Sequence, residues 1–317
     1  MQSQSKKMNN QEYIKLIKKS HDEKLRLTRK QEKQIKEFYN KIHLKLSKKL
    51  SKLDNDNLQE KLLLAILKSL SEDIYSMQGE LENSFKENMT EIANIANDTQ
   101  LDMLLHLDKV YKLGLSVVLI KIFKDIPNKA VNSILRGNIY KDDKSIDKRI
   151  KKALNKLQID LKYIVKEGVK QNKNNSEIIK DLKTYTKVGT VKSVKWCNSY
   201  PEASKKVDYH IQTICRTSFN HAYQEAQKES CRRNPYVIGI KWLVSNSHKV
   251  CPLCQDRNGV IYKIDEVPLD HPRGLCTTIP VLEKELDQIG EELKSWIEGE
   301  SNSKLDNWFN EYGSEFI

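Results

Sequence analysis

Four residues in the last quarter of the chain have the types and spacing of a metal site. Cys251 and Cys254 form a Cys-x-x-Cys pair, and His271 and Cys276 follow after gaps of sixteen and four residues. The first pair has the spacing that lets two thiolates from one tight turn reach a tetrahedral ion, and the second pair can close the site from another loop. Three thiolates and one imidazole form a closed, structural zinc set, which leaves no position for a reactive water.

Other interpretations of this pattern remain open. Cys251 and Cys254 are alternatively reduced thiols in a small apolar element, or a redox pair, although no βαβ pattern surrounds them. His248 lies three residues before Cys251 and could replace His271 as a ligand. All cysteines lie beyond position 196, and the first residues lack the apolar core of a secretory signal, which disfavours a disulfide scaffold. Core or surface thiols are expected at Cys197, Cys215 and Cys231.

The metal ligands fall in a segment with strand character. Residues 237–244 are rich in β-branched and aromatic side chains, and Asn258-Gly259 is a hairpin-turn signal before residues 260–262. Residues 277–281 are a third strand candidate, which Pro280 restricts to the edge of a sheet. The sequence predicts short antiparallel strands in an element of about 45 residues, too small to hold a large core, so zinc is expected to stabilise it.

The rest of the chain is expected to be helical. Gly and Pro are absent from residues 1–78, and apolar residues recur every three or four positions in 35–53 and again in 58–74. Asn55-Asp56-Asn57 separates these runs, so we expect a helical hairpin that continues as a bundle to about Phe123.

The second half of the chain continues the helical pattern with one interruption. Periodic apolar positions predict a helix over 145–168, a short helix over 176–182 and another helix over 207–228. Residues 184–206 fit no clear period and are interpreted as a loop or an extended segment.

Pro127 and the polar run 141–144 mark a boundary between the amino-terminal helices and the remainder. The fold class is therefore mainly α with a small β element. The expected regions are a basic then acidic helical arm (1–126), a domain with a helical part and a zinc-type β part (127–282, divided into 127–234 and 235–282), and an acidic amphipathic tail (283–317).

The tail has an apolar stripe as well as its acidic charge. Residues 283–317 hold ten acidic and three basic residues, and Leu305, Trp308, Phe309 and Tyr312 fall at helical spacing. The tail could dock on the chain's own basic regions or on a partner.

The net charge of +12 is distributed in alternating blocks. Residues 1–53 hold 16 Lys/Arg against 5 Asp/Glu and residues 111–200 hold 21 against 8, whereas residues 54–110 hold 4 against 12 and residues 201–317 hold 14 against 18. Neighbouring helices that neutralise one another would explain this pattern, and so would non-specific contact with DNA or with an acidic protein surface. The longest apolar stretch, residues 113–123, is too short to cross a bilayer, so no membrane partner is expected.

A set of residues in the second half of the chain resembles a known pattern. Its members are Arg216-Thr217-Ser218 on a helix, Trp242 in a strand, Cys251-Pro252-Leu253-Cys254, the Asn258-Gly259 turn, His271-Pro272, Cys276 and Ile279-Pro280-Val281. The pattern resembles the head-morphogenesis domain of tailed phages, the family named after the F protein of phage Mu, over about residues 130–282. It departs from the family at Ser218, where an acidic residue is usual, and it keeps only the second cysteine of the usual His-Pro-x-Cys-Arg-Cys ending.

The resemblance implies a minor capsid protein, present in few copies, that acts in head assembly. The expected partners are the portal protein, other capsid proteins and, without sequence preference, packaged DNA. The expected location is the virion, after assembly in the host cytoplasm. The alternative is a cellular zinc-containing nucleic-acid-binding protein, although no recognised reading helix adjoins the metal site.

Structural roles rather than catalytic ones are expected for the remaining residues of the pattern, Arg216, Thr217 and Trp242. The planar guanidinium of Arg216 can tie its helix to loop carbonyls or carboxylates, although an ordinary surface arginine is an equally good interpretation. The sequence has no glycine-rich phosphate loop, Gly-x-Ser-x-Gly elbow or His-Glu-x-x-His motif, so we expect no enzymatic activity.

Overall fold

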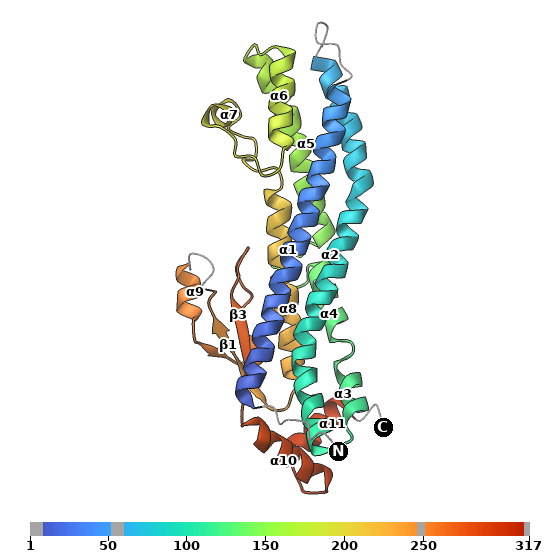
Figure 1. Ribbon diagram of the computed structural model, residues 1–317, viewed down its shortest axis with the longest axis vertical. Helices are drawn as coiled ribbons and strands as arrows, with labels where there is room; N and C mark the ends of the chain where they lie inside the picture. The colour runs from blue at the N-terminus through green and yellow to red at the C-terminus, as the bar shows by residue number, and fades with distance from the viewer. Residues whose placement is uncertain (1–8, 52–59, 246–250, 314–317) are drawn as a thin grey trace, which may run out of the picture. The chain divides into compact units, whose positions relative to one another are not determined.

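The computed structural model describes residues 9–51, 60–245 and 251–313. The chain is mainly helical with a small antiparallel sheet, as the sequence predicts (Figure 1). In chain order the helices are α1 (Asn10–Leu50), α2 (Glu60–Tyr111), α3 (Ser116–Phe123), α4 (Ile126–Arg136), α5 (Ile146–Lys170), α6 (Asn175–Thr186), α7 (Val194–Ser199), α8 (Tyr209–Arg232), α9 (Pro252–Arg257), α10 (Leu286–Ile297) and α11 (Ser303–Tyr312), with a 3₁₀ turn η1 (Ile264–Glu266).

The two long helices α1 and α2 follow from a sequence without early chain breakers. A capping box begins α1, because Asn9 Oδ1 accepts the Glu12 amide (2.9 Å) and Glu12 Oε2 accepts the Asn9 amide (3.1 Å). Gly79 lies inside α2 without ending it. The predicted break at residues 55–57 lies outside the described residues.

Contacts between α1 and α2 show in which direction each helix runs: residues late in α1 meet residues early in α2, and the reverse holds at the other end. Near the end of α1, Lys45 pairs with Asp73 of α2 (3.1 Å). Near its beginning, the Tyr13 hydroxyl accepts a hydrogen bond from Gln100 of α2 (2.6 Å). The helices are therefore antiparallel, as in the predicted hairpin.

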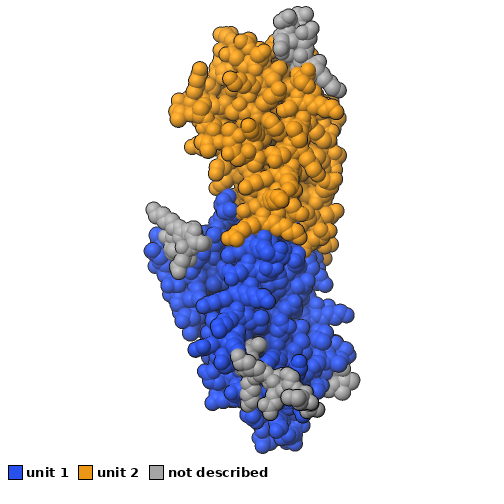
Figure 2. Space-filling view, in the orientation of Figure 1, with its two compact units in different colours: residues 1–28, 88–134, 216–317 blue, residues 29–87, 135–215 orange. Residues whose placement is uncertain are grey.

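The chain divides into two compact units, and neither of them is continuous in sequence (Figure 2). Unit 1 comprises residues 1–28, 88–134 and 216–317, and unit 2 comprises residues 29–87 and 135–215. The boundaries expected at 126/127 and 282/283 do not follow these units, because α1, α2 and α8 each contribute residues to both. Pro127 lies in the first turn of α4, where its missing N–H breaks no helical hydrogen bond. The division into an arm, a middle domain and a tail stays a prediction.

Unit 1 has an apolar core to which both ends of the described chain contribute. This core includes side chains from four helices besides the tail: Tyr13 and Ile17 of α1, Met103 and Leu107 of α2, Ile122 and Phe123 of α3, and Ile126 of α4. The tail helices α10 and α11 add Leu286, Ile289, Leu293, Leu305 and Trp308. Trp308 also donates from Nε1 to the Arg233 carbonyl (2.8 Å) at the end of α8. The acidic tail thus packs on its own chain, through apolar side chains rather than through charge.

Unit 2 contains helical structure where the sequence suggested only a loop. Helix α6 continues to Thr186, and α7 follows with Ser193 as its cap, which accepts the Trp196 amide (3.2 Å). Trp196 is buried and stacks on Tyr185 of α6, with ring centroids 6.0 Å apart and planes 5° from parallel. Trp196 also packs on Tyr200, with ring centroids 5.0 Å apart, so aromatic contacts help to order a segment that has no apolar period of its own.

The sheet lies in unit 1 and has the strand order β2-β1-β3, with both pairs antiparallel. Its strands are β1 (Val237–Leu243), β2 (Ile261–Tyr262) and β3 (Thr277–Leu282). Pro280 lies in the edge strand β3, as predicted, opposite Ile240. Asn258-Gly259 is not the turn of a simple hairpin, because α9 intervenes between β1 and β2. Gly259 instead has a left-handed φ of 82° and donates its amide to the Trp242 carbonyl (2.8 Å).

Replacing Gly79 and Gly290 with alanine should change stability in opposite directions. Gly79 is exposed on α2, and no atom lies near an added methyl group, so Gly79→Ala should stabilise the fold by roughly 0.5–1 kcal/mol. At Gly290 of α10 the methyl group would overlap the ring of Tyr111, whose hydroxyl donates a hydrogen bond to the Asp287 carbonyl (3.2 Å). Gly290→Ala should therefore destabilise the fold by roughly 1–3 kcal/mol. Urea unfolding measures both, and shifts of the same sign would contradict this packing.

Candidate metal centre

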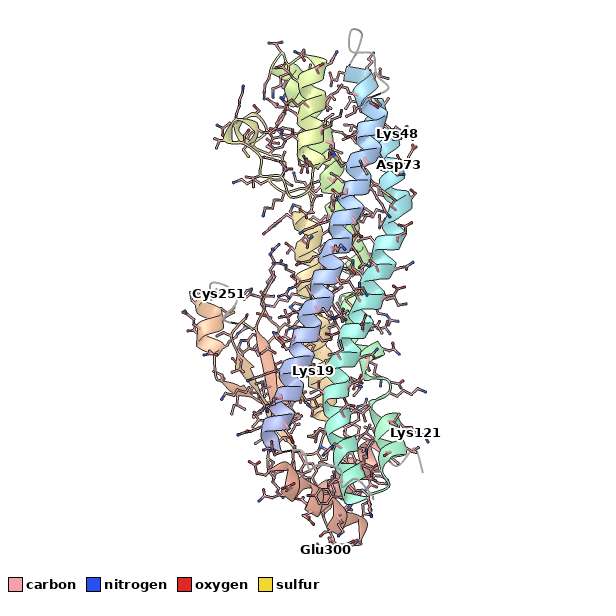
Figure 3. The ribbon with its side chains drawn as sticks, viewed as in Figure 1. Lys19, Lys48, Asp73, Lys121, Cys251 and Glu300 are labelled. Carbon is pink, nitrogen blue, oxygen red and sulfur yellow. The ribbon has the colours of Figure 1, made fainter. Side chains whose placement is uncertain are left out.

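Short elements of unit 1 bring the four predicted ligands to one place. Cys251 is the residue before α9, and Pro252 begins that helix, so Cys254 lies on its first turn (Figure 3). His271 and Cys276 lie in the loop that leads from η1 into β3. The α9 turn and this loop come from opposite sides of the central strand β1, which explains why ligands far apart in sequence can converge.

The distances between ligand atoms are close to those that a tetrahedral metal requires. His271 Nε2 lies 3.1 Å from Cys254 Sγ, and Cys276 Sγ lies 3.5 Å from Cys254 Sγ. The ligand atoms of Cys251, Cys254 and His271 all lie within 4.8 Å of one another. Sulfur atoms bound to one zinc ion are about 3.8 Å apart, given Zn–S bonds of about 2.3 Å. The predicted ligands therefore form a cluster compatible with a metal site.

The imidazole of His271 is held in the tautomer that a metal ligand needs. Its Nδ1 lies 3.0 Å from the Pro272 carbonyl oxygen, which can only accept, so Nδ1 carries the proton and Nε2 has a lone pair towards Cys254. Burial lowers the pKa of His271, but this carbonyl and the Asp270 carboxylate outweigh burial and raise the pKa above its usual value.

The two cysteines of the α9 turn lie in different environments. The Cys254 side chain is fully buried, and burial raises the pKa of its thiol. Hydrogen bonds from the Cys254 amide and thiol lower the pKa of the more exposed Cys251. A buried thiol loses its proton readily only beside a cation, so a metal ion would supply the charge that Cys254 lacks.

Asp270 is a buried carboxylate that positions the backbone of two ligands. Its Oδ1 accepts the amide of the adjacent His271 (2.8 Å), and its Oδ2 accepts the Cys276 amide (3.1 Å). Oδ2 also accepts the side-chain amide of Asn220 from α8 (2.9 Å). A side chain at position 274 would overlap the Asp270 carboxylate, so the loop can approach the carboxylate this closely only because residue 274 is glycine. Asp270 therefore fixes the ligand loop from within.

The polar face of α8 holds the same loop from outside. Its residues contact the loop and the start of β3 through Thr217 Oγ1 with the Arg273 amide (3.1 Å), His221 Nε2 with the Asp270 carbonyl (2.8 Å), Gln224 Oε1 with the Asp270 amide (3.0 Å) and Gln227 Nε2 with the Thr278 carbonyl (3.2 Å). Sequence reasoning missed this face. Its signal was present, because Thr217, Asn220, Gln224 and Gln227 recur every three or four residues on a helix with an apolar opposite side.

Lys24 of α1 adds a buried amino group to this network. Its Nζ donates to Asn220 Oδ1 (2.7 Å) and lies 4.8 Å from the centroid of the Tyr223 ring. Burial lowers the pKa of Lys24 to about 7, against the opposing effects of Asp270 and Cys276. Three thiolates around a divalent metal leave a net negative charge beside Asp270, and Lys24 is placed to offset part of it.

The other predicted residues differ in how closely they approach the site. Trp242 of β1 is fully buried against Cys254 and Cys276, and the Arg257 guanidinium lies 5.1 Å from its ring centroid. Thr217 contacts the ligand loop as described, whereas Arg216 is half-buried on α8 and its proposed tie to loop carbonyls stays a prediction. His248, the alternative ligand, lies outside the described residues. Three cysteines lie outside the cluster: Cys197, Cys215 and Cys231.

Comparison with known proteins does not assign the chain to a family. No protein-family model, curated protein or solved structure matches it. Within the described ranges, none of the helices has the length and apolar character needed to cross a membrane.

Cys254→Ser should abolish metal binding. Elemental analysis of the wild-type chain should give about one zinc per chain, whereas the variant, lacking a buried thiolate, should retain almost none. Helical content measured by circular dichroism should persist, because the long helices lie outside the ligand set. Cys197→Ser is the matched control, since it removes a thiol of α7 outside the cluster and should keep the metal. Wild type that keeps an intact sheet and takes up no zinc when zinc is supplied would refute the site, and metal retained in Cys276→Ser alone would point to His248.

Asp270→Asn should weaken metal binding by roughly 10- to 100-fold, the usual effect of losing a group that orients ligands. The amide nitrogen of asparagine cannot accept one of the N–H groups that the carboxylate now receives. Competition with a coloured chelator measures the change. Asp265→Asn is the control, because Asp265 lies on η1 with a side chain 76% exposed and pairs with Arg232 rather than with the ligand loop. Equal affinities in both variants would show that Asp270 does not position the ligands.

Proposed function

We propose that this chain is a minor head protein of a tailed phage or prophage, with a structural role at the portal during head assembly. The observation that supports the proposal is the convergence of residues that carry the family resemblance. Trp242, the Cys251–Cys254 turn, His271 and Cys276 belong to one cluster, and Thr217 contacts the same ligand loop. The spacing in the sequence alone does not require that these residues meet.

Zinc is the metal proposed for the cluster, in a structural role. Three sulfur ligands and one imidazole favour zinc over calcium or magnesium, which prefer oxygen. A fourfold protein ligand set leaves no coordination position for substrate, so we infer an interaction protein rather than an enzyme.

The portal protein is the principal proposed partner, and DNA is the second. The basic blocks of the sequence supply phosphate contacts for duplex DNA without base recognition, so affinity would fall steeply with salt. Other capsid proteins, and a location in the virion after assembly in the host cytoplasm, follow from the same proposal.

Co-expression with the portal protein encoded in the same genome tests this function. The wild-type chain should co-purify with the portal through affinity capture and size-exclusion chromatography. Cys254→Ser should lose most of this association if the metal-bound element forms part of the portal contact, whereas Cys197→Ser should keep it. A wild-type chain that binds duplex DNA but never the portal would overturn the proposal in favour of a cellular zinc-containing nucleic-acid-binding protein. Neighbouring portal and scaffold genes would support the phage role.

A further inference from the structure

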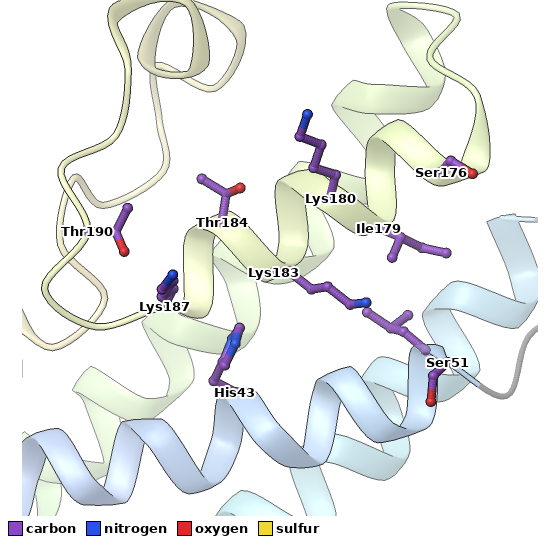
Figure 4. Close-up of a pocket in the computed structure, with 10 residues that line it drawn as sticks. His43, Ser51, Ser176, Ile179, Lys180, Lys183, Thr184, Lys187 and Thr190 are labelled. Carbon is purple, nitrogen blue, oxygen red and sulfur yellow. The ribbon is translucent and has the colours of Figure 1, made fainter.

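A second candidate site is formed by residues of unit 2, none of which belongs to the metal cluster. A cavity of about 680 Å³ opens between the last turns of α1, helix α6 and the segment that follows it (Figure 4). Its lining combines three lysines, four hydroxyl groups and one imidazole. The lining residues are His43, Leu50, Ser51, Ser176, Ile179, Lys180, Lys183, Thr184, Lys187 and Thr190.

Among the residues that the structure describes, no carboxylate lines this cavity, and the acidic residues of α6 are engaged elsewhere. Glu177 completes the capping box of the helix by accepting the Asn174 amide (2.9 Å). Asp181 accepts hydrogen bonds from Lys173 (2.9 Å) and from the Tyr200 hydroxyl (2.7 Å). Neither acidic side chain is therefore available to neutralise the lysines of the cavity.

The lysines of the cavity differ from those on the opposite side of α1. Lys45 and Lys49 lie 3.1 Å and 3.0 Å from the carboxylate of Asp73 on α2. In contrast, Lys180, Lys183 and Lys187 have no ion pair within the described part of the chain. They recur three and four residues apart, Lys180 and Lys183 on α6 and Lys187 directly after its end, so their like charges repel one another. An anion in the cavity would remove this repulsion.

His43 reports the positive potential of the cavity. Thr186 donates its hydroxyl proton to the Leu182 carbonyl (3.1 Å), so its oxygen accepts from His43 Nδ1 (2.8 Å) and fixes the imidazole. Burial, and then Lys187 and Lys183, lower the pKa of His43. Figure 4 shows Lys183 extending from α6 towards Ser51 at the end of α1.

A simpler role for the lysines is to neutralise the carboxyl end of α1. That end carries a partial negative charge of about half an elementary charge, which is less than the charge of a single ammonium group. The cavity therefore keeps a positive excess after this interaction, together with hydroxyl donors that a helix end does not need.

We propose that this cavity binds a phosphate group. Ammonium and hydroxyl donors around one space match the several oxygens and high charge of phosphate, and the volume would hold a diphosphate. The phosphate belongs either to a small polyphosphate or to the backbone of DNA. The site stands on its own contacts and does not depend on the portal role.

Titration with inorganic pyrophosphate, followed through the His43 ring signals by NMR at low salt, tests the site. Pyrophosphate should shift these signals and raise the pKa of His43, because the anion offsets Lys183 and Lys187. The variant Lys183→Gln/Lys187→Gln should bind pyrophosphate at least roughly tenfold more weakly, since two close charges are lost. The matched control Lys162→Gln/Lys166→Gln removes two exposed lysines with the same spacing from α5, outside the cavity, and should change the affinity less than about twofold.

Duplex DNA then distinguishes the two sources of phosphate. DNA that displaces pyrophosphate from His43 would assign the site to the nucleic-acid backbone. DNA that leaves the His43 signals in their pyrophosphate-bound positions would assign it to a small polyphosphate. Unchanged His43 signals at millimolar pyrophosphate, or equal weakening in the two double variants, would overturn the site. Neither result depends on whether the portal binds.

Discussion

The carboxylate of Asp270 is the constraint on which the metal cluster depends. Removing a charge from water is costly, and a buried carboxylate is tolerated only when hydrogen-bond donors surround it. Here the donors are the backbone amides of His271 and Cys276 and the side-chain amide of Asn220. Satisfying the charge therefore also bends the loop so that two ligands face Cys254. The loop is shaped by a requirement that exists before any metal binds.

This arrangement changes the role that the metal must perform. An isolated element of about 45 residues would depend on zinc for its folding. In this chain the ligand loop is also held by α8, and through Asn220 the network reaches Lys24 of α1. Metal binding would therefore close and neutralise a site whose loop is already anchored, and its loss would loosen the α9 turn more than the sheet.

Local patterns predicted much of the fold and the ligand set, whereas contacts between distant segments could not be predicted. Ligand spacing identified Cys251, Cys254, His271 and Cys276, and hydrophobic period identified the long helices, because both signals are encoded within a few turns. Helix α9 was hidden, since Asn258-Gly259 has the same composition as a hairpin turn. The partner of Asp270 was also hidden, because Asn220 lies 50 positions away and only the tertiary fold brings the two together.

The basic residues show most clearly what the sequence cannot predict, because a count of lysines and arginines does not tell which of them are buried, which are paired and which can bind an anion. Lys24, Lys45 and Lys183 all belong to the basic blocks of the sequence. The first is buried beside Asn220 and Asp270, the second pairs with Asp73, and the third lines a cavity whose described residues include no carboxylate. Only the third kind offers its full charge to a polyanion, so the net charge overstates the surface available for phosphate. The geometry of α6, not the total of +12, defines where an anion would bind.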